Sequence, residues 1–360
     1  GSPALGFAIG AVGGALQSLR PVAGVRPSDE VAALLDPVYL AGADQLAAGL
    51  DASAGTIYVD AGQESLRSIG RFADTIGHHQ GNALFETEDA TSDPFWSAVI
   101  GSSVDVDDGG EGYDAKTGGL VLGAEGEVGG TFAGLQSVWL GGALSYTRTN
   151  LDDDHGSADL DSYQAALYGS ARLDAFVLRG AAGFGHVEAD LVRSTLVSSQ
   201  ISSPDGNGGF AEVNLGLPLA SDAGVFLPSV GVGYRGFRRS SVSEDGAFGL
   251  DLAAKTFEEG YVTAGLAWQQ SYLLNGVTLK PTVSVAYRGD FLDIADSQSA
   301  SLIGAGFESA GADVGANALL ASAGAEIAFS DRLSAGLRYE TEQRAHLSEH
   351  AVKFDFSLRW

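Results

Sequence analysis

Two residue types and one kind of segment are absent from this chain of 360 residues. It contains no cysteine, which excludes disulfides, zinc–thiolate sites and iron–sulfur clusters. It contains no methionine, even at position 1, so we expect the carboxyl-terminal part of a larger product or a processed form. Uninterrupted apolar runs of about 18 residues are also absent, which argues against a transmembrane helix. If the chain spans a membrane, it must do so as a closed β-barrel.

Basic residues are scarce, with 20 Lys and Arg against 46 Asp and Glu, for a net charge of -26. This charge would repel phosphates, so we expect no nucleic-acid partner. It suits an outer surface bathed in divalent cations, although plain solubility explains it equally well. Glycine is abundant, at 51 residues, but its runs lack a phosphate-binding GxxxxGK[ST] motif and suit a tightly sheared barrel better.

The carboxyl-terminal segment alternates strictly between apolar and polar residues. Val352, Phe354, Phe356, Leu358 and Trp360 are apolar and the residues between them are polar, which predicts a strand with one apolar face. An edge strand of a β-sandwich would alternate too, but chain ends are usually frayed and polar. The segment resembles the targeting strand of bacterial outer-membrane barrels, which the barrel-assembly machinery recognises. That resemblance implies an assembly signal made of Phe354, Phe356, Leu358 and Trp360.

Alternating segments fill the chain from Pro94 onward. Their connections are in turn very short and then long and acidic, which is typical of an up-and-down membrane barrel. We therefore predict an all-β membrane protein, a twelve-stranded antiparallel transmembrane barrel, with strands at 94–106, 113–128, 134–149, 159–173, 175–190, 208–219, 224–238, 257–272, 276–289, 315–329, 332–343 and 348–360. The strict alternation of connections places both ends of the barrel on one side, which we predict to be periplasmic. Tyrosines sort by strand direction into two belts, as membrane interfaces favour.

Charged residues alternate with Leu, Val and Phe along these strands. A dry barrel core would cost several kcal/mol for each unpaired ion, whereas a wet lumen accommodates mixed charges. Twelve strands should leave a lumen that is wider than an eight-stranded barrel and narrower than a porin. We predict that the lumen is lined by Glu125, Glu127, Gln164, Arg172, Arg179, Lys280, Arg288, Glu326, Arg338, Glu340, Lys353 and Arg359.

The region before the barrel carries helical signals. Residues 1–24 show no secure period, while 28–38 and 44–50 suit short helices. The segment 61–78 suits a better helix, because four apolar residues recur at spacings of three and four. This helix could pack on a globular core or plug the pore, and its apolar stripe is Leu66, Ile69, Phe72 and Ile76. From His78 to Pro94 the sequence is polar and predicts a linker or the approach to a hairpin.

No catalytic or metal site stands out among the residues. Adjacent histidines at 78 and 79 on a helix would point apart, so they do not chelate a metal together. The acidic run at 152–155 could bind calcium loosely, but a solvated loop explains it better because the spaced ligands of a dedicated site are missing. No paired nucleophile and base is apparent. We predict no cofactor, no metal and no enzyme activity.

Two motifs resemble the autotransporter β-domains of type V secretion. The family's first hairpin commonly contains GYD..TGG..LG.E, which matches residues 112–125. Its pre-barrel helix usually carries DQL.G..HAS, of which Asp44-Gln45-Leu46 and Ala52-Ser53 are present, while Asp51 stands where the family has His. The resemblance covers about residues 40–360. It implies 1–35 as a remnant of the passenger junction, 36–93 as a helical linker threading the pore, and 94–360 as the translocator barrel.

The resemblance also implies a location and partners. The barrel would lie in the bacterial outer membrane, in contact with lipid and lipopolysaccharide, and export its own amino-terminal passenger. Periplasmic chaperones and the barrel-assembly machinery would deliver it, and we expect a monomer. Some members cleave the linker at an Asn in the pore helix, but 61–78 contains no Asn, which argues against self-cleavage. The alternative is a small-solute channel or a barrel-embedded enzyme of the outer membrane.

Overall fold

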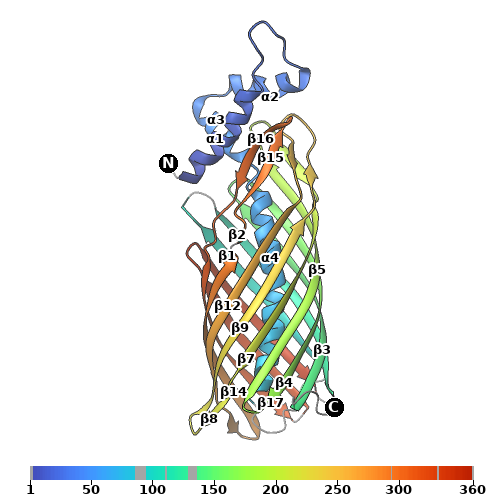
Figure 1. The fold of residues 1–360 in the computed structure, drawn as a ribbon, viewed down its shortest axis with the longest axis vertical. Coiled ribbons are helices and arrows are strands. Elements are labelled where there is room, and N and C mark those ends of the chain that lie inside the picture. The colour runs from blue at the N-terminus through green and yellow to red at the C-terminus, as the bar shows by residue number, and fades with distance from the viewer. Residues whose placement is uncertain are drawn as a thin grey trace.

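Twelve long antiparallel strands close into one barrel (Figure 1). The computed structural model describes residues 3–85, 95–109, 112–128, 136–292, 294–330 and 332–358. The barrel strands are β1 (Phe95–Asp107), β2 (Gly112–Val128), β3 (Gln136–Asp153), β4 (Gly156–Leu173), β5 (Phe176–Ser194), β7 (Asp205–Gly216), β9 (Gly224–Arg239), β12 (Lys255–Gln269), β14 (Val277–Leu292), β17 (Asn317–Ser330), β18 (Leu333–Gln343) and β19 (Leu347–Leu358). The predicted number and order of strands are confirmed, with ends that differ by a few residues.

The barrel closes where its last strand meets its first. In this seam β19 pairs with β1 from Phe95 opposite Leu358 to Val106 opposite Leu347. On the far side of the barrel β9 pairs with β12, so every long strand has a neighbour on both edges. A closed sheet leaves no backbone edge unpaired, which a lipid environment requires.

Side chains alternate between the lumen and the outer surface. On β19, Val352 and Phe354 are each 50% exposed, whereas Ala351 and Lys353 are 6% and 5% exposed. The belt tyrosines point outward as well: Tyr146, Tyr163, Tyr234, Tyr287 and Tyr339 are all exposed. An apolar outer surface with tyrosines near the strand ends is the pattern of a transmembrane barrel.

The two ends of the barrel differ in their connections. At the short-turn end, Asp174 and Asn275 adopt left-handed φ angles of 50° and 52°, which Asp and Asn tolerate in tight turns. Two short strands, β8 (Leu219–Ser221) and β13 (Tyr272–Leu274), extend the wall there.

The long-loop end carries more order than the sequence predicts. A short strand, β6 (Ser199–Ser202), extends the pairing of β5. The stretches 239–256 and 290–314, expected only as long connections, form a second four-stranded sheet of β10 (Val242–Ser243), β11 (Leu250–Leu252), β15 (Ser297–Leu302) and β16 (Ala305–Ala310). Its apolar side chains are buried, with Leu250 and Leu302 both at 0% exposure. These strands are too short for their alternation to be recognised in the sequence.

Four helices precede the barrel: α1 (Pro3–Ser18), α2 (Asp29–Leu40), α3 (Ala43–Ala52) and α4 (Ile57–Leu84). Figure 1 shows α4 running along the inside of the barrel and α1, α2 and α3 beyond the long-loop end. Ser28 caps α2 by accepting a hydrogen bond from the Val31 amide, and Gly55, at φ 79°, separates α3 from α4. Within the described ranges, no helix is long and apolar enough to cross a membrane.

In this region one helix is not predicted from the sequence and one predicted boundary is wrong. Residues 1–24 show no helical period, yet α1 occupies 3–18, because glycine and alanine give too little contrast for a face to be recognised. The linker predicted from His78 instead continues α4 to Leu84, so the pore helix does contain an asparagine, Asn82, and the expectation of a helix without one is wrong. Polar residues there bond to the barrel wall, as when the Gln80 amide donates to the Gly169 carbonyl at 2.7 Å. Residues 86–94 lie outside the described ranges.

Candidate functional site

Helix α4 lies inside the lumen and presents two chemically different faces to the wall. Its backbone lies closest to β4, β5, β7 and β9, so the helix is off the barrel axis. The predicted apolar stripe is buried between the helix and the barrel wall: Leu66, Ile69, Phe72 and Ile76 are each at most 1% exposed. Burial of four large apolar side chains is a favourable but non-directional source of adhesion between helix and wall.

Aromatic residues and glycines of the wall receive this apolar face. The Phe72 ring meets Phe210 edge-on, with centroids 6.0 Å apart. At Gly208, an added Cβ would lie 2.5 Å from Ile69 Cδ1, so the wall needs a glycine there. At Gly62, an added Cβ would lie 2.2 Å from the Phe257 ring, so the helix needs a glycine too. The lumen is therefore not uniformly wet, contrary to the sequence expectation, because Phe210, Phe237 and Phe257 also point into it.

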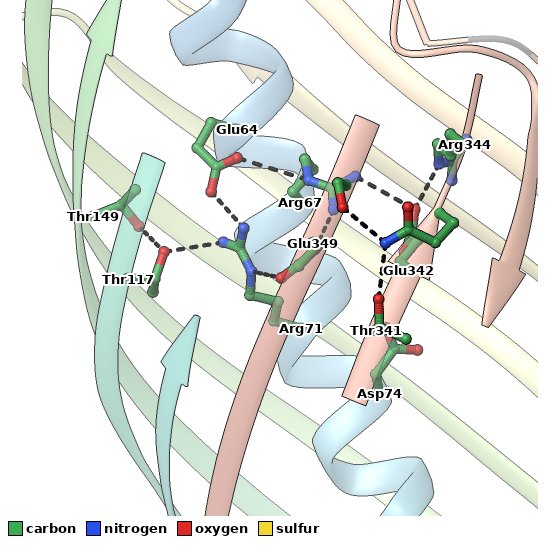
Figure 2. A network of polar contacts seen from close by, with 12 residues as sticks. Glu64, Arg67, Arg71, Asp74, Thr117, Thr149, Thr341, Glu342, Arg344 and Glu349 are labelled. Atoms are coloured by element: carbon green, nitrogen blue, oxygen red, sulfur yellow. Dashed lines mark hydrogen bonds and ion pairs between the residues drawn. The ribbon is translucent and has the colours of Figure 1, made fainter. Parts of the chain in front are cut away.

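The opposite face of α4 carries charges that reach across to β18 and β19 (Figure 2). Arg71 is held by two carboxylates: its Nη2 lies 2.6 Å from Glu64 Oε1 and its Nε lies 2.6 Å from Glu349 Oε1. Arg67 pairs with the same Glu349 and, at 3.4 Å, with Glu342. These side chains bridge the wider gap that the off-centre helix leaves on this side.

The charged face belongs to a larger buried network. Arg344, directly after β18, pairs with Glu342 at 2.5 Å, with Asp290 at 2.6 Å and with Glu259. Arg235 pairs with Glu259, while Arg288 pairs with Asp74 at 3.4 Å. The network contains the arginines Arg67, Arg71, Arg235, Arg288 and Arg344 and the carboxylates Glu64, Asp74, Glu259, Asp290, Glu342 and Glu349.

Near-balance of charge makes this network tolerable in a closed lumen. An unpaired buried ion costs several kcal/mol, whereas each ion here has at least one opposite partner. Neutral polar groups complete the shell: Arg71 Nη1 donates to Thr117 Oγ1 at 3.2 Å, and Thr117 bonds Thr149. On an adjacent part of the wall, Ser68 bonds Thr147 at 3.0 Å and accepts from Gln164.

The two adjacent histidines hold the carboxyl-terminal part of α4 to two nearby places on the wall, one on β18 and one on β1 and β2. His78 Nδ1 lies 2.6 Å from Glu340 Oε1, and Lys353 Nζ lies 2.9 Å from the other oxygen of Glu340. His79 Nε2 lies 3.2 Å from Glu125 and its ring stacks on Trp96. The two rings do point apart, and among the described residues no group of His, Asp and Glu is arranged to hold a metal ion.

At the long-loop end, loops from several hairpins bond the start of α4. The Tyr58 hydroxyl donates to Glu244 at 2.6 Å, and Glu244 also pairs with Arg193. Asp60 accepts from the Ala312 amide at 3.1 Å.

The α3 end is anchored by a pair outside the barrel wall. The carboxylate of Asp51 lies 3.0 Å from His155 Nε2 in the β3–β4 turn. Burial raises the pKa of Asp51 above its ordinary value, and the nearby His155 partly offsets that increase.

Most sequence-predicted lumen residues contact α4 or one another. Besides those named above, the Arg179 guanidinium donates to the Gly77 carbonyl at 2.6 Å, and Lys280 lies 3.7 Å from Glu326. Arg172 and Arg338 are partly buried, Glu127 is exposed at the end of β2, and Arg359 and Trp360 lie outside the described ranges. Phe354, Phe356 and Leu358 are exposed on the outer surface.

Several members of the network are not among the residues predicted to line the lumen. Glu342 follows the predicted Glu340 by two residues, and Glu349 precedes the predicted Lys353 by four, so period two would have placed both in the lumen. Arg344, Asp290 and Glu259 lie at strand ends or near long connections, where the alternation gives no guide.

Comparisons with known proteins agree with this architecture. The family model described as the autotransporter β-domain matches residues 95–340. An extracellular serine protease of Serratia marcescens is 28% identical over 158 residues, which are 42% of this chain and only 14% of that protein. The translocator domain of the autotransporter NalP from Neisseria meningitidis superimposes with a TM-score of 0.63 at 16% identity, over 85% of this chain and 100% of that one. The β-domain of the Bordetella autotransporter BrkA gives 0.58 at 13% identity, over 75% and 100%.

Proposed function

We propose that this chain, which belongs to the autotransporter β-domain family, is the outer-membrane translocator of an exported amino-terminal passenger. The observation that carries the proposal is the path of α4. Its carboxyl end leads toward β1 at the short-turn end, while its amino end joins α1, α2 and α3 beyond the long loops (Figure 1). Any segment fused before α1 is therefore delivered to the long-loop side of the membrane.

The orientation follows the usual arrangement of outer-membrane barrels, with short turns in the periplasm and long loops outside. Both ends of the barrel, Phe95 and Leu358, then face the periplasm. We assign residues 36–93 to the linker and 94–360 to the translocator, with 1–35 as the junction to the passenger. The lumen-lining residues hold the linker in the pore, and the proposal assigns catalysis to none of them.

The proposal includes partners that suit this role. The outward-facing aromatic residues Phe354 and Phe356, with Trp360 at the end of the chain, offer the barrel-assembly machinery an apolar strand to recognise. Periplasmic chaperones would keep the unfolded barrel soluble, and lipid and lipopolysaccharide would surround the folded monomer. A small-solute channel is the weaker alternative, because α4 occupies the lumen along its length.

Surface display tests the proposal. The chain is expressed in a Gram-negative bacterium behind a secretion signal, with an epitope before residue 1. We expect antibody to bind intact cells, and a variant lacking 347–358 to show no surface epitope, because its barrel cannot close at β1. An epitope that is detected only after the outer membrane is permeabilised would contradict the proposal.

A further inference from the structure

An internal cavity separates the charged face of α4 from part of the barrel wall. Its volume is about 100 Å³, enough for several water molecules. Asp74 and His78 line it from the helix, and Ser284, Ser322 and Glu340 line it from β14, β17 and β18. The cavity exists because α4 packs against β4, β5, β7 and β9, on the other side of the lumen.

Exposure along the helix shows which way this cavity opens. The side chains of Glu64, Arg67 and Arg71 are 0%, 4% and 7% exposed. One and two turns further on, those of Asp74 and His78 are 35% and 34% exposed. Solvent therefore reaches the charged face from the carboxyl end of α4, where the short turns lie.

The other end of the cavity is closed by the buried network. The Arg344 side chain is 0% exposed and joins Asp290, Glu259 and Glu342, which come from β14, β12 and β18. Arg67 then connects Glu342 to the helix. Together these ion pairs cross the gap between helix and wall at one level of the barrel.

We propose that the cavity is the inner end of a water-filled half-channel, which admits water and small ions from the short-turn end and stops at the Arg67, Glu342 and Arg344 ion pairs. The lining is polar and carries both charges: Asp74, Glu340, Glu342 and Glu349 lie beside Arg71 and Lys353, and Arg67, Arg288 and Arg344 pair with carboxylates of this set. Ionised and hydroxyl side chains of this kind keep a space hydrated. The permeability barrier of the plugged barrel is then one layer of side chains and not the whole helix.

The absence of cysteine makes a direct test available. Ser322→Cys places a thiol in the cavity, and Ala318→Cys places one on the same strand and face, where Ala318 lies opposite Arg288 and is 1% exposed. Ser284→Cys, whose serine hydroxyl bonds that of Ser322 at 2.7 Å, is a second cavity position. The full chain is refolded into liposomes, its orientation is measured by proteolysis of the long loops, and small methanethiosulfonate reagents are added to either side.

We expect Ser322→Cys and Ser284→Cys to react in the folded protein from the short-turn side with both an aminoethyl and a sulfonatoethyl reagent, because the charges of the lining are nearly balanced. Ala318→Cys should react only after unfolding. Gel mobility without heating verifies that each variant is folded. Equal reactivity at Ser322 and Ala318, reaction from the long-loop side, or no reaction in both folded cavity variants would overturn the proposal. Labelling is measured on purified protein, so its outcome is independent of whether the chain exports a passenger.

Discussion

The two sides of the lumen hold the same helix by different means. On the side of β7, β9 and β12, α4 contacts Phe210, Gly208 and Phe257 through apolar packing. On the side of β18 and β19, the helix stands farther away and ion pairs of Arg67 and Arg71 span the distance. The free energy of the apolar contacts depends mainly on the surface area that they bury, whereas the ion pairs depend on the distance and orientation of the charged groups.

This difference indicates a division of roles. Apolar contact alone would tolerate small shifts of the helix along or around its axis, whereas Glu349 can accept from both Arg67 and Arg71 only in one register. Buried ion pairs are weak evidence for stability, since well-packed apolar residues often serve as well, but they can specify a single arrangement. We therefore expect the packed side to determine how tightly α4 binds and the charged side to determine where it binds.

The largest effect should come from Glu349→Ala. This change removes the carboxylate shared by Arg67 and Arg71 and leaves their charges under-compensated in a buried site, at a cost of about 4 kcal/mol. Urea unfolding in lipid vesicles, followed by tryptophan fluorescence, measures the loss. The control is Glu188→Ala, whose side chain is 63% exposed on the outer surface and should change little. Equal effects of the two changes would refute a special role for the charged side.

A smaller effect is expected from Phe72→Ala on the packed side. Truncation removes the edge-on contact with Phe210 and leaves a cavity, at a cost of about 3 kcal/mol. The matched change Phe184→Ala removes a ring that is 71% exposed on the outer face and should cost less. Combined with Glu349→Ala, the Phe72 effect should add, because the two residues share no partner. A double variant whose loss of stability differs strongly from the sum of the two single losses would contradict separate roles for the packed side and the charged side.

The smallest effects are expected from glycine-to-alanine changes in α4, which test how closely the helix approaches the wall. Gly62→Ala introduces a methyl group 2.2 Å from the Phe257 ring and should destabilise the protein by about 1–2 kcal/mol. At Gly77 the same change meets only Glu212 Oε1 at 3.5 Å, so the better helix propensity of alanine should stabilise by up to about 1 kcal/mol. The same unfolding experiment compares them, and shifts of the same sign would contradict the close approach of helix and wall at Gly62.

The sequence predicts the barrel well because period two and turn chemistry are local signals. Alternation along 347–358 determines the facing of every residue in β19. Asn275-Gly276 marks the turn between β13 and β14 without reference to any distant contact. The stripe from Leu66 to Ile76 is equally local, since a helix repeats every three to four residues.

The pairing inside the lumen is not predictable in this way. Which carboxylate meets Arg67 depends on the rotation and height of α4 in the barrel, which no single segment encodes. Glu342 and Glu349 are separated from Arg67 by 275 and 282 residues. The off-centre position of α4 is similarly a property of the whole cross-section, because it follows from glycines on β7 and bulky rings on β9 and β12.

The seam of the barrel gives the ion pairs a consequence for assembly. Glu349 belongs to β19, the strand that pairs with β1 to close the sheet, and Glu342 belongs to its neighbour β18. The strands that close the barrel therefore also bind α4 through ion pairs. Closure of the barrel and binding of the helix are thus energetically coupled. A lateral opening between β1 and β19 that displaces β19 would loosen α4 from the wall, and a helix already in place would favour closure by the same amount of free energy.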